Sequence, residues 1–232
     1  LKRFIKKRRD ANKPLDEPET WTVFSQIVDA LAHLHRRDVG VAHRDVKPAN
    51  VLVVNGVVKL ADLGLGKRIA PSRENLETDF DGNGDGDARN KTMRSKVGTP
   101  YYVAPEIVRG DPYGLASDVW SLGCVLYELL TGLHPFDGAS LKLLIAKITK
   151  GVFVPVTGCS VDLANAVKQM LQRDPSKRPS VNNLLQKKPF KERACVLLDP
   201  ATHEDEFSHT VLHTPKKTEV VRRVSRVSPR VL

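Results

Sequence analysis

The sequence predicts a mainly α-helical fold that carries one small β-hairpin. Apolar residues recur at helical spacing in most of the chain, whereas residues 51–60 contain two β-branched runs separated by Asn55-Gly56. With 232 residues, 41% hydrophobic and 28% charged, the chain is long and apolar enough to bury a core. This composition and the three widely spaced cysteines exclude collagenous, fully disordered and disulfide-scaffold proteins.

The chain begins with a basic segment, residues 1–13, in which Leu1, Phe4 and Ile5 give a predicted helix an apolar edge. Residues 1–13 carry a net charge of +6 and residues 216–232 one of +5, so the residues between contribute −1 to the formal net charge of +10. We therefore expect a solvated surface helix, with a phosphate-binding arm as the alternative, and no nucleic-acid partner.

The following elements are predicted from apolar spacing and from residues that start or stop helices. A core-facing helix covers residues 21–35, and a tight hairpin with a type I′ turn covers residues 51–60. A helix that is apolar on nearly all sides begins at a Ser117 cap, ends at Leu130 before Gly132, and is expected in the centre. Three further helices are expected at residues 140–150, 160–172 and 180–187.

Two polar segments lack apolar periodicity. Residues 71–97 are predicted to be a flexible acidic insert, and residues 195–232 a basic, disordered C-terminal extension. Residues 79–90 match the opening of a calcium-binding EF-hand loop, but Gly86 and Asn90 stand where that loop needs an apolar residue and a glutamate. An acidic flexible insert is therefore favoured over a calcium site. No segment is apolar for long enough to span a membrane.

The hairpin indicates where chemistry occurs, because it folds the chain back and brings Asn50 and Asp62 close together. An amide oxygen and a carboxylate are ligands that suit Mg²⁺ with a bound phosphate substrate. Asp45 lies on the same loop and is placed to accept the proton of an attacking hydroxyl, and Lys47 supplies a cation. These groups are what phosphoryl transfer requires of a protein.

Five motifs in these residues resemble the catalytic half of eukaryotic serine/threonine protein kinases, and two of them are most similar to the NIMA-related kinases. They are HRDVKPAN at 43–50, ADLGLG at 61–66, GTPYYVAPE at 98–106, SDVWSLGC at 117–124 and RDPSKRPS at 173–180. The resemblance implies the C-terminal lobe of an α+β kinase fold in residues 1–194, with its catalytic loop at 43–50 and its activation segment at 62–106.

The resemblance also implies roles at the active site, with ATP and Mg²⁺ as cofactors. Asp45 would be the catalytic base, Lys47 would contact the transferred phosphate, and Asn50 and Asp62 would hold the metal. Leu52 would lie beneath the adenine ring, and the alternative is an ordinary core leucine of the hairpin. Thr99 would form hydrogen bonds toward Asp45 and Lys47.

Other residues have structural or regulatory roles by the same resemblance. Glu106 and Arg178 would form a buried ion pair, Asp118 would brace the catalytic loop, and His43 would be structural. Ser95 would take an activating phosphate from an upstream kinase, with Arg44 as its counter-charge. The alternative for Ser95 is an ordinary exposed loop serine.

The chain begins at Leu1. It contains no glycine-rich phosphate loop before the catalytic loop and no Val-Ala-x-Lys lysine. We therefore expect that the N-terminal lobe is absent and that this chain alone is inactive. The alternative is a C-lobe-only module that binds proteins without catalysis. The expected partners are ATP and protein substrates, and the free cysteines favour a cytoplasmic location.

Overall fold

The structure, a computed structural model, describes residues 1–54, 56–68, 99–187 and 190. It confirms a helix-rich fold with small antiparallel sheets. The α-helices are α1 (Lys2–Asp10), α2 (Glu17–His35), α4 (Pro105–Arg109), α5 (Leu115–Thr131), α6 (Leu141–Lys150), α7 (Val161–Met170) and α8 (Val181–Leu185). The strands are β1 (Val41–Ala42), β2 (Val51–Val54), β3 (Val57–Leu60) and β4 (Lys67–Arg68), and short 3₁₀ helices are η1 (Pro48–Asn50), η2 (Leu63–Leu65) and η3 (Pro175–Lys177).

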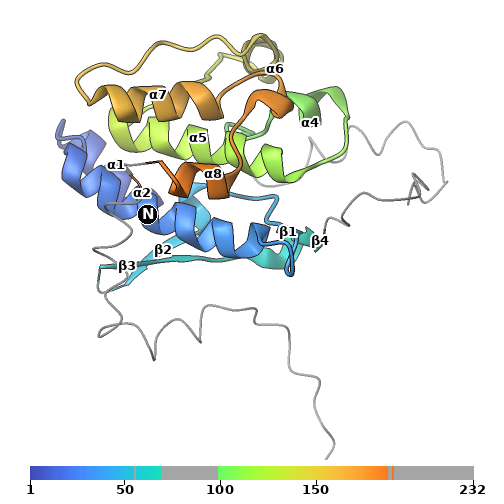
Figure 1. The fold of residues 1–232 in the computed structure, drawn as a ribbon. Coiled ribbons are helices and arrows are strands. Elements are labelled where there is room, and N and C mark those ends of the chain that lie inside the picture. Colours follow the sequence, from blue (N-terminus) through green and yellow to red (C-terminus); the bar gives the residue numbers. More distant parts are fainter. Residues whose placement is uncertain (55, 69–98, 188–189, 191–232) are drawn as a thin grey trace, which may run out of the picture.

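The helices form layers around α5 (Figure 1). Helix α5 packs against α7 on one side and α2 on the other, and α2 also contacts α8 and β3. One continuous cluster of buried apolar side chains joins these elements, with Trp21, Phe24, Trp120 and Phe136 among its largest members. No helix in the described ranges is both long and apolar enough to cross a membrane.

Helix α2 begins one turn before the predicted start at Trp21. Asp16 caps it, since its Oδ1 accepts a hydrogen bond of 2.8 Å from the backbone amide of Glu19. The Glu19 carboxylate in turn accepts a hydrogen bond from the amide of Asp16. This reciprocal capping satisfies two amides at the helix start, which the apolar stripe alone does not reveal.

Helix α5 is buried along nearly its whole length, as predicted, but Ser117 is not its cap. The helix begins at Leu115 after Gly114, so Ser117 lies within the first turn. There its hydroxyl accepts a hydrogen bond from the amide of Gly114 and donates one of 2.8 Å to Glu106. Gly132 ends the helix in the left-handed conformation, with φ of 70°.

Helices are present in the three predicted C-terminal segments, and serines cap all three. Ser140, Ser160 and Ser180 each accept a hydrogen bond from the amide three residues later. The predicted ends were too late, because α7 stops at Met170 and α8 at Leu185. Helix α7 ends where the backbone of Leu171 leaves the helical conformation, at φ −89° and ψ 31°.

The predicted hairpin is present as β2 and β3, which pair from Val51 with Leu60 to Val54 with Val57. Gly56 has φ of +82°, a conformation that glycine adopts without strain. The structure also contains the pair of β1 and β4, which was not predicted because strands of two residues are too short to produce a pattern.

Several predictions fall outside the described residues. They are the turn residue Asn55, the acidic insert 71–97 with the calcium alternative at 79–90, Ser95, and the extension 195–232.

Candidate active site

The loop at residues 43–50 is held in place by Asp118 of the buried helix α5. The Asp118 carboxylate accepts hydrogen bonds from the backbone amides of His43, at 2.8 Å, and Arg44, at 2.9 Å. His35 Nε2 lies 2.9 Å from Oδ2, and the Tyr113 hydroxyl donates to Oδ1 at 2.8 Å. The carboxylate therefore joins the start of the loop to α2 and α5.

Burial by itself would raise the pKa of Asp118. The hydrogen bond and charge of His35 and the amides of His43 and Arg44 outweigh this effect, and the pKa lies below its ordinary value. A carboxylate that accepts several hydrogen bonds is stabilised in its ionised form. Asp118 is thus a fixed negative charge beneath the loop.

Three of the expected catalytic side chains meet at the carboxylate of Asp45. Its Oδ2 accepts a hydrogen bond of 2.6 Å from Lys47 Nζ and one of 2.8 Å from Asn50 Nδ2. Asn50 Nδ2 also donates to the backbone carbonyl of Asp45, at 2.8 Å. The carboxylate of Asp45 therefore has a defined orientation, with a cation beside it.

His43 connects this loop to the strand that leads to Asp62. The buried His43 ring donates from Nε2 to the carbonyl of Ala61, at 3.1 Å, and its Nδ1 accepts from the amide of Asp45, at 3.3 Å. Burial lowers the pKa of His43, which keeps the ring neutral and compatible with both roles. The amide of Ala61 also donates to the carbonyl of Asn50, at 2.8 Å.

Asp62 follows Ala61 directly, so the hairpin brings its backbone next to Asn50. It adopts a left-handed conformation with φ of 67°, which is uncommon for a residue other than glycine. The carboxylate of Asp62 is exposed, and neither it nor the Oδ1 of Asn50 has a hydrogen-bond partner among the described residues. Both are hard oxygen donors of the type that Mg²⁺ prefers.

The structure does not bring Thr99 to this group. Its side chain is exposed and makes no hydrogen bond to Asp45 or Lys47 in the part of the chain that is described. Thr99 is the first described residue after the gap at 69–98. Its carbonyl accepts a backbone hydrogen bond from Tyr101. The expected hydrogen bonds of Thr99 toward Asp45 and Lys47 are therefore not formed in this structure.

Arg44 lies within the loop at 43–50, and Leu52 lies in β2, directly after it. The alternative for Leu52 as a core residue of the hairpin is wrong, because 49% of it is exposed. Arg44 has φ of 69°, its guanidinium lies over the ring of Tyr113, and its buried Nε has no hydrogen-bond partner among the described residues.

The structure also pairs Glu106 and Arg178, which are far apart in sequence. Arg178 donates from Nη1 and Nη2 to the two carboxylate oxygens of Glu106, both at 2.7 Å. Burial opposes ionisation of Glu106, but the hydrogen bonds and charge of Arg178 hold its pKa below the ordinary value. The pair ties the end of segment 99–106 to the helical core.

Three residues of the site were not predicted from the sequence. His35 and Tyr113 contact Asp118, and the Tyr102 hydroxyl donates a hydrogen bond of 2.6 Å to Glu128 of α5. The only sequence signal is a polar residue on an otherwise apolar helix, as at His35 and Glu128. Burial raises the pKa of Glu128, although the hydrogen bond from Tyr102 opposes that change.

The sequence of this helix-rich domain matches that of a known protein family. Residues 1–190 match the family model described as the protein kinase domain, and the chain therefore belongs to the protein kinase family. The match begins at residue 1 and does not confirm the expected absence of an N-terminal lobe.

Within this family the chain is similar to serine/threonine kinases of the Nek group. It is 39% identical over 193 residues to serine/threonine-protein kinase Nek5 of Homo sapiens, covering 82% of this chain and 24% of that protein. It is 41% identical over 188 residues to probable serine/threonine-protein kinase nek3 of Dictyostelium discoideum, with coverage of 78% and 15%. It is 38% identical to serine/threonine-protein kinase Nek1 of Mus musculus, with coverage of 79% and 14%. The chain thus spans about a quarter or less of these relatives.

Proposed function

We propose that this chain is the substrate-binding and catalytic part of a serine/threonine protein kinase that transfers the γ-phosphate of ATP to protein hydroxyls. The observation that carries the proposal is the carboxylate of Asp45, which is fixed by Lys47 at 2.6 Å and Asn50 at 2.8 Å. In this proposal Asp45 orients the acceptor hydroxyl and accepts its proton as the oxygen attacks phosphorus. Lys47 balances the negative charge of the transferred phosphate.

The free oxygens of Asn50 and Asp62 suit a divalent cation. Asn50 uses its amide nitrogen for Asp45, which leaves Oδ1 available, and the Asp62 carboxylate is exposed and without a hydrogen bond among the described residues. When bound, Mg²⁺ would neutralise charge on the ATP phosphates. Asn50 therefore has two roles, since the same side chain holds Asp45 and offers an oxygen to the metal.

The exposed strand β2 supports an adenine site. Leu52, Val53 and Val54 each expose close to half of their surface, and Leu52 gives an apolar contact for one face of the base. A flat ring needs cover on its other face as well. We propose that the 232 residues alone do not transfer phosphate, because they contain no Val-Ala-x-Lys motif and no glycine-rich phosphate loop before the catalytic loop.

A regulatory phosphate on Ser95 remains part of the proposal. Arg44 is its proposed counter-charge, and the unpartnered Nε of that residue is the feature that supports the role. An upstream kinase would supply the phosphate.

The test compares phosphate transfer from labelled ATP to a serine-containing protein by the longest polypeptide that the gene encodes. Asp45→Asn keeps the hydrogen-bonding shape but removes the base, so transfer should fall by about 10³-fold while the melting temperature changes little. Asp38→Asn, an exposed carboxylate paired only with Arg36 among the described residues, is the matched control. Transfer by Asp45→Asn at the parent rate contradicts the proposal and leaves the non-catalytic module as the better account.

A further inference from the structure

Helix α1 carries several cations that the described structure does not neutralise. Six of its nine residues are Lys or Arg, and only Asp10 is acidic. Arg8 pairs with Glu19 of α2, and Arg9 Nε lies 3.8 Å from Asp10. The other cations have no ion-pair partner within 4 Å in the described ranges; they are Lys2, Arg3, Lys6 and Lys7.

The two flanks of α1 differ in what they contact. The buried residue Ile5 faces the core, and on one flank the Arg8 guanidinium lies over the ring of Phe4 and pairs with α2. The other flank holds Lys2, Lys6 and Arg9, which share one helix face because they are spaced by four and three residues. We call these three exposed residues the α1 row.

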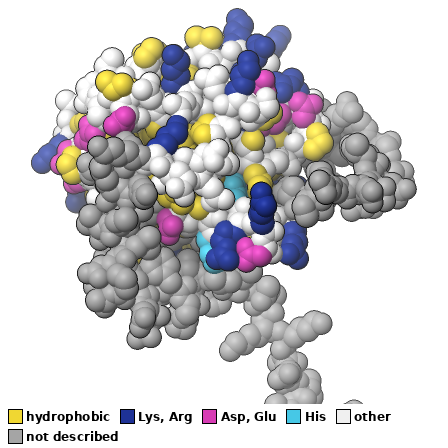
Figure 2. All heavy atoms as spheres, in the orientation of Figure 1, with side chains coloured by type: hydrophobic (Ala, Val, Ile, Leu, Met, Phe, Trp, Pro, Cys, Tyr) yellow, Lys and Arg dark blue, Asp and Glu magenta, His cyan; other side chains and the backbone are white. Residues whose placement is uncertain are grey.

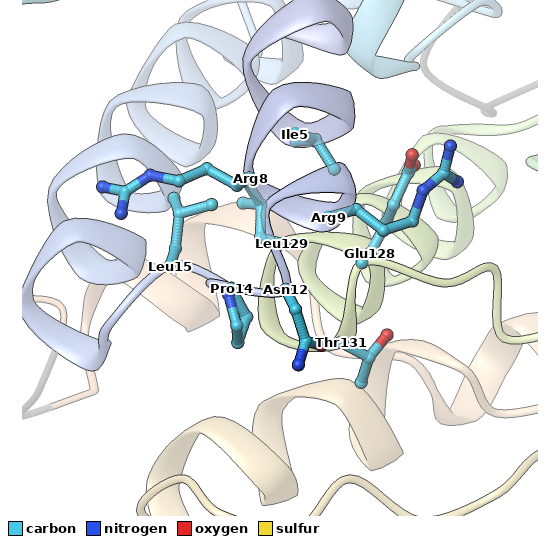
Figure 3. A pocket seen from close by; sticks show the side chains of 10 residues that line it. Ile5, Arg8, Arg9, Asn12, Pro14, Leu15, Glu128, Leu129 and Thr131 are labelled. Carbon is cyan, nitrogen blue, oxygen red and sulfur yellow. The ribbon is translucent and has the colours of Figure 1, made fainter.

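One end of the α1 row lies beside the segment that follows Thr99. A pocket of about 110 Å³ separates α1 from the end of α5, and Figure 3 shows Arg9 and Glu128 extending to the same side of it. The Arg9 stem packs on the backbone at Gly132, where an added Cβ would lie 3.4 Å from it. Lys2 and Arg9 both act electrostatically on Glu128, whose carboxylate accepts from Tyr102.

The other end of the helix lies beside the catalytic loop. The backbone nitrogen of Leu1 donates a hydrogen bond of 2.7 Å to the carbonyl of Val51, the residue directly after Asn50. Lysines also gather over α6 at the top of Figure 2, but the main contact of α6 is with α4. The α1 row therefore lies between the catalytic loop and segment 99–106, and its two lysines have no ion-pair partner within 4 Å among the described residues.

We propose that the α1 row binds acidic side chains of the protein segment whose hydroxyl is presented to Asp45. This inference rests on the proposed kinase function and adds its substrate class, an acceptor flanked by acidic residues. From Lys2 to Arg9 the row is about 10 Å long, the length of about three residues of extended peptide. Acidic side chains at that spacing can each meet one cation.

A peptide fits this surface better than a nucleic acid. The carboxylates of Asp10 and Glu128 flank the row, and both would repel a continuous phosphate backbone. A peptide places its charges on separate side chains and can keep them away from these carboxylates. Surface charge pairs of this kind act mainly on specificity and on the rate of association.

The test measures how labelled peptides bind to the longest polypeptide that the gene encodes, by fluorescence anisotropy at two salt concentrations. Two serine peptides of equal length are compared, one with glutamates and one with lysines on both sides of the serine. The acidic peptide should bind at least tenfold more tightly, and Lys2→Glu with Lys6→Glu should weaken it by about tenfold. Arg3→Glu with Lys7→Glu makes the same charge change on the neighbouring exposed side of the helix, about 100° around the axis, and should alter binding less than twofold.

Each outcome separates this inference from the proposed function. Phosphorylation of both peptides with no preference for the acidic one, or equal losses in the two double variants, overturns the α1 row while leaving the kinase proposal intact. Row-dependent binding of the acidic peptide without phosphorylation supports the surface and contradicts the kinase proposal. Tighter binding of a single-stranded RNA of equal charge than of the acidic peptide also overturns the inference.

Discussion

Arg178 holds both carboxylate oxygens of Glu106 at 2.7 Å, although the two residues are 72 positions apart in sequence. The pair is buried, and each partner has a further contact. Arg178 Nη1 also donates to the carbonyl of Ala116, at 2.8 Å, and Ser117 donates to Glu106. The core of the domain thereby fixes the end of the segment that leads from Thr99 to α4.

Removing one partner should destabilise the domain severely. Arg178→Met leaves the Glu106 carboxylate buried without its cation, and we expect a loss of about 3 to 5 kcal/mol in the free energy of unfolding. Urea denaturation followed by circular dichroism measures it. Arg109→Met, an exposed arginine paired only with Asp111 among the described residues, should cost less than about 1 kcal/mol. Equal costs for the two variants would contradict a dominant role for the buried pair.

A single added methyl group should disturb the contact between α5 and α7. A Cβ on Gly123 would lie 2.9 Å from both Leu171 Cδ2 and Met170 Cβ, closer than packed carbons allow. Gly123→Ala should therefore lower the free energy of unfolding by about 1 to 3 kcal/mol, despite the better helix propensity of alanine. Gly114→Ala, where a Cβ would meet no atom within 4 Å, is the control in the same urea titration. Unchanged stability of Gly123→Ala would show that the two helices are not packed this closely.

The buried ring of His43 should make the stability depend on pH. Burial lowers its pKa in the folded state, so the unfolded chain takes up the proton first as the pH falls. Its contribution is complete above the unfolded pKa of about 6.5 and is lost as the pH drops through the lower folded pKa. The free energy of unfolding should fall from pH 7 to pH 5, and His43→Asn should reduce that slope.

Two other histidines help to assign the pH dependence of the free energy of unfolding to His43. Burial also lowers the pKa of His134, which contributes with the same sign, so the His43 variant should leave a residual slope. His33→Asn, at an exposed position of α2, is the control and should keep the slope of the parent. An identical slope in the His43 variant and the parent would refute the assignment.

The proposed metal role of Asp62 predicts a change in the Mg²⁺ requirement for phosphate transfer by the longest polypeptide that the gene encodes. Asp62→Asn removes a charge from an exposed residue without a hydrogen bond in the described structure, so the fold should stay intact. The Mg²⁺ concentration for half-maximal transfer should rise at least about tenfold, because carboxylate charge is a main source of affinity for this ion. Asp111→Asn is the exposed control. An unchanged Mg²⁺ requirement would remove Asp62 from the proposed ligands.

Local features of the site were predictable because they depend on near neighbours in sequence. The contacts of Asp45 with Lys47 and Asn50 join residues two and five positions apart, and the hairpin follows from β-branched runs around a glycine turn. The serine caps of α6, α7 and α8 are equally local. The prediction of Ser117 as the cap of α5 was wrong. Ser117 lies within the first turn and donates a hydrogen bond to Glu106, a contact that no local pattern shows.

The sequence by itself determined the helix-rich fold, the hairpin and which polar residues share the loop at 43–50. The tertiary structure alone decided that His35 and Tyr113 meet Asp118, that Tyr102 meets Glu128, and that Lys2 and Lys6 of α1 have no ion-pair partner in the described chain. The reason is physical: hydrogen bonds between near neighbours are set by chain geometry, whereas the charge state of a buried group depends on what packs around it.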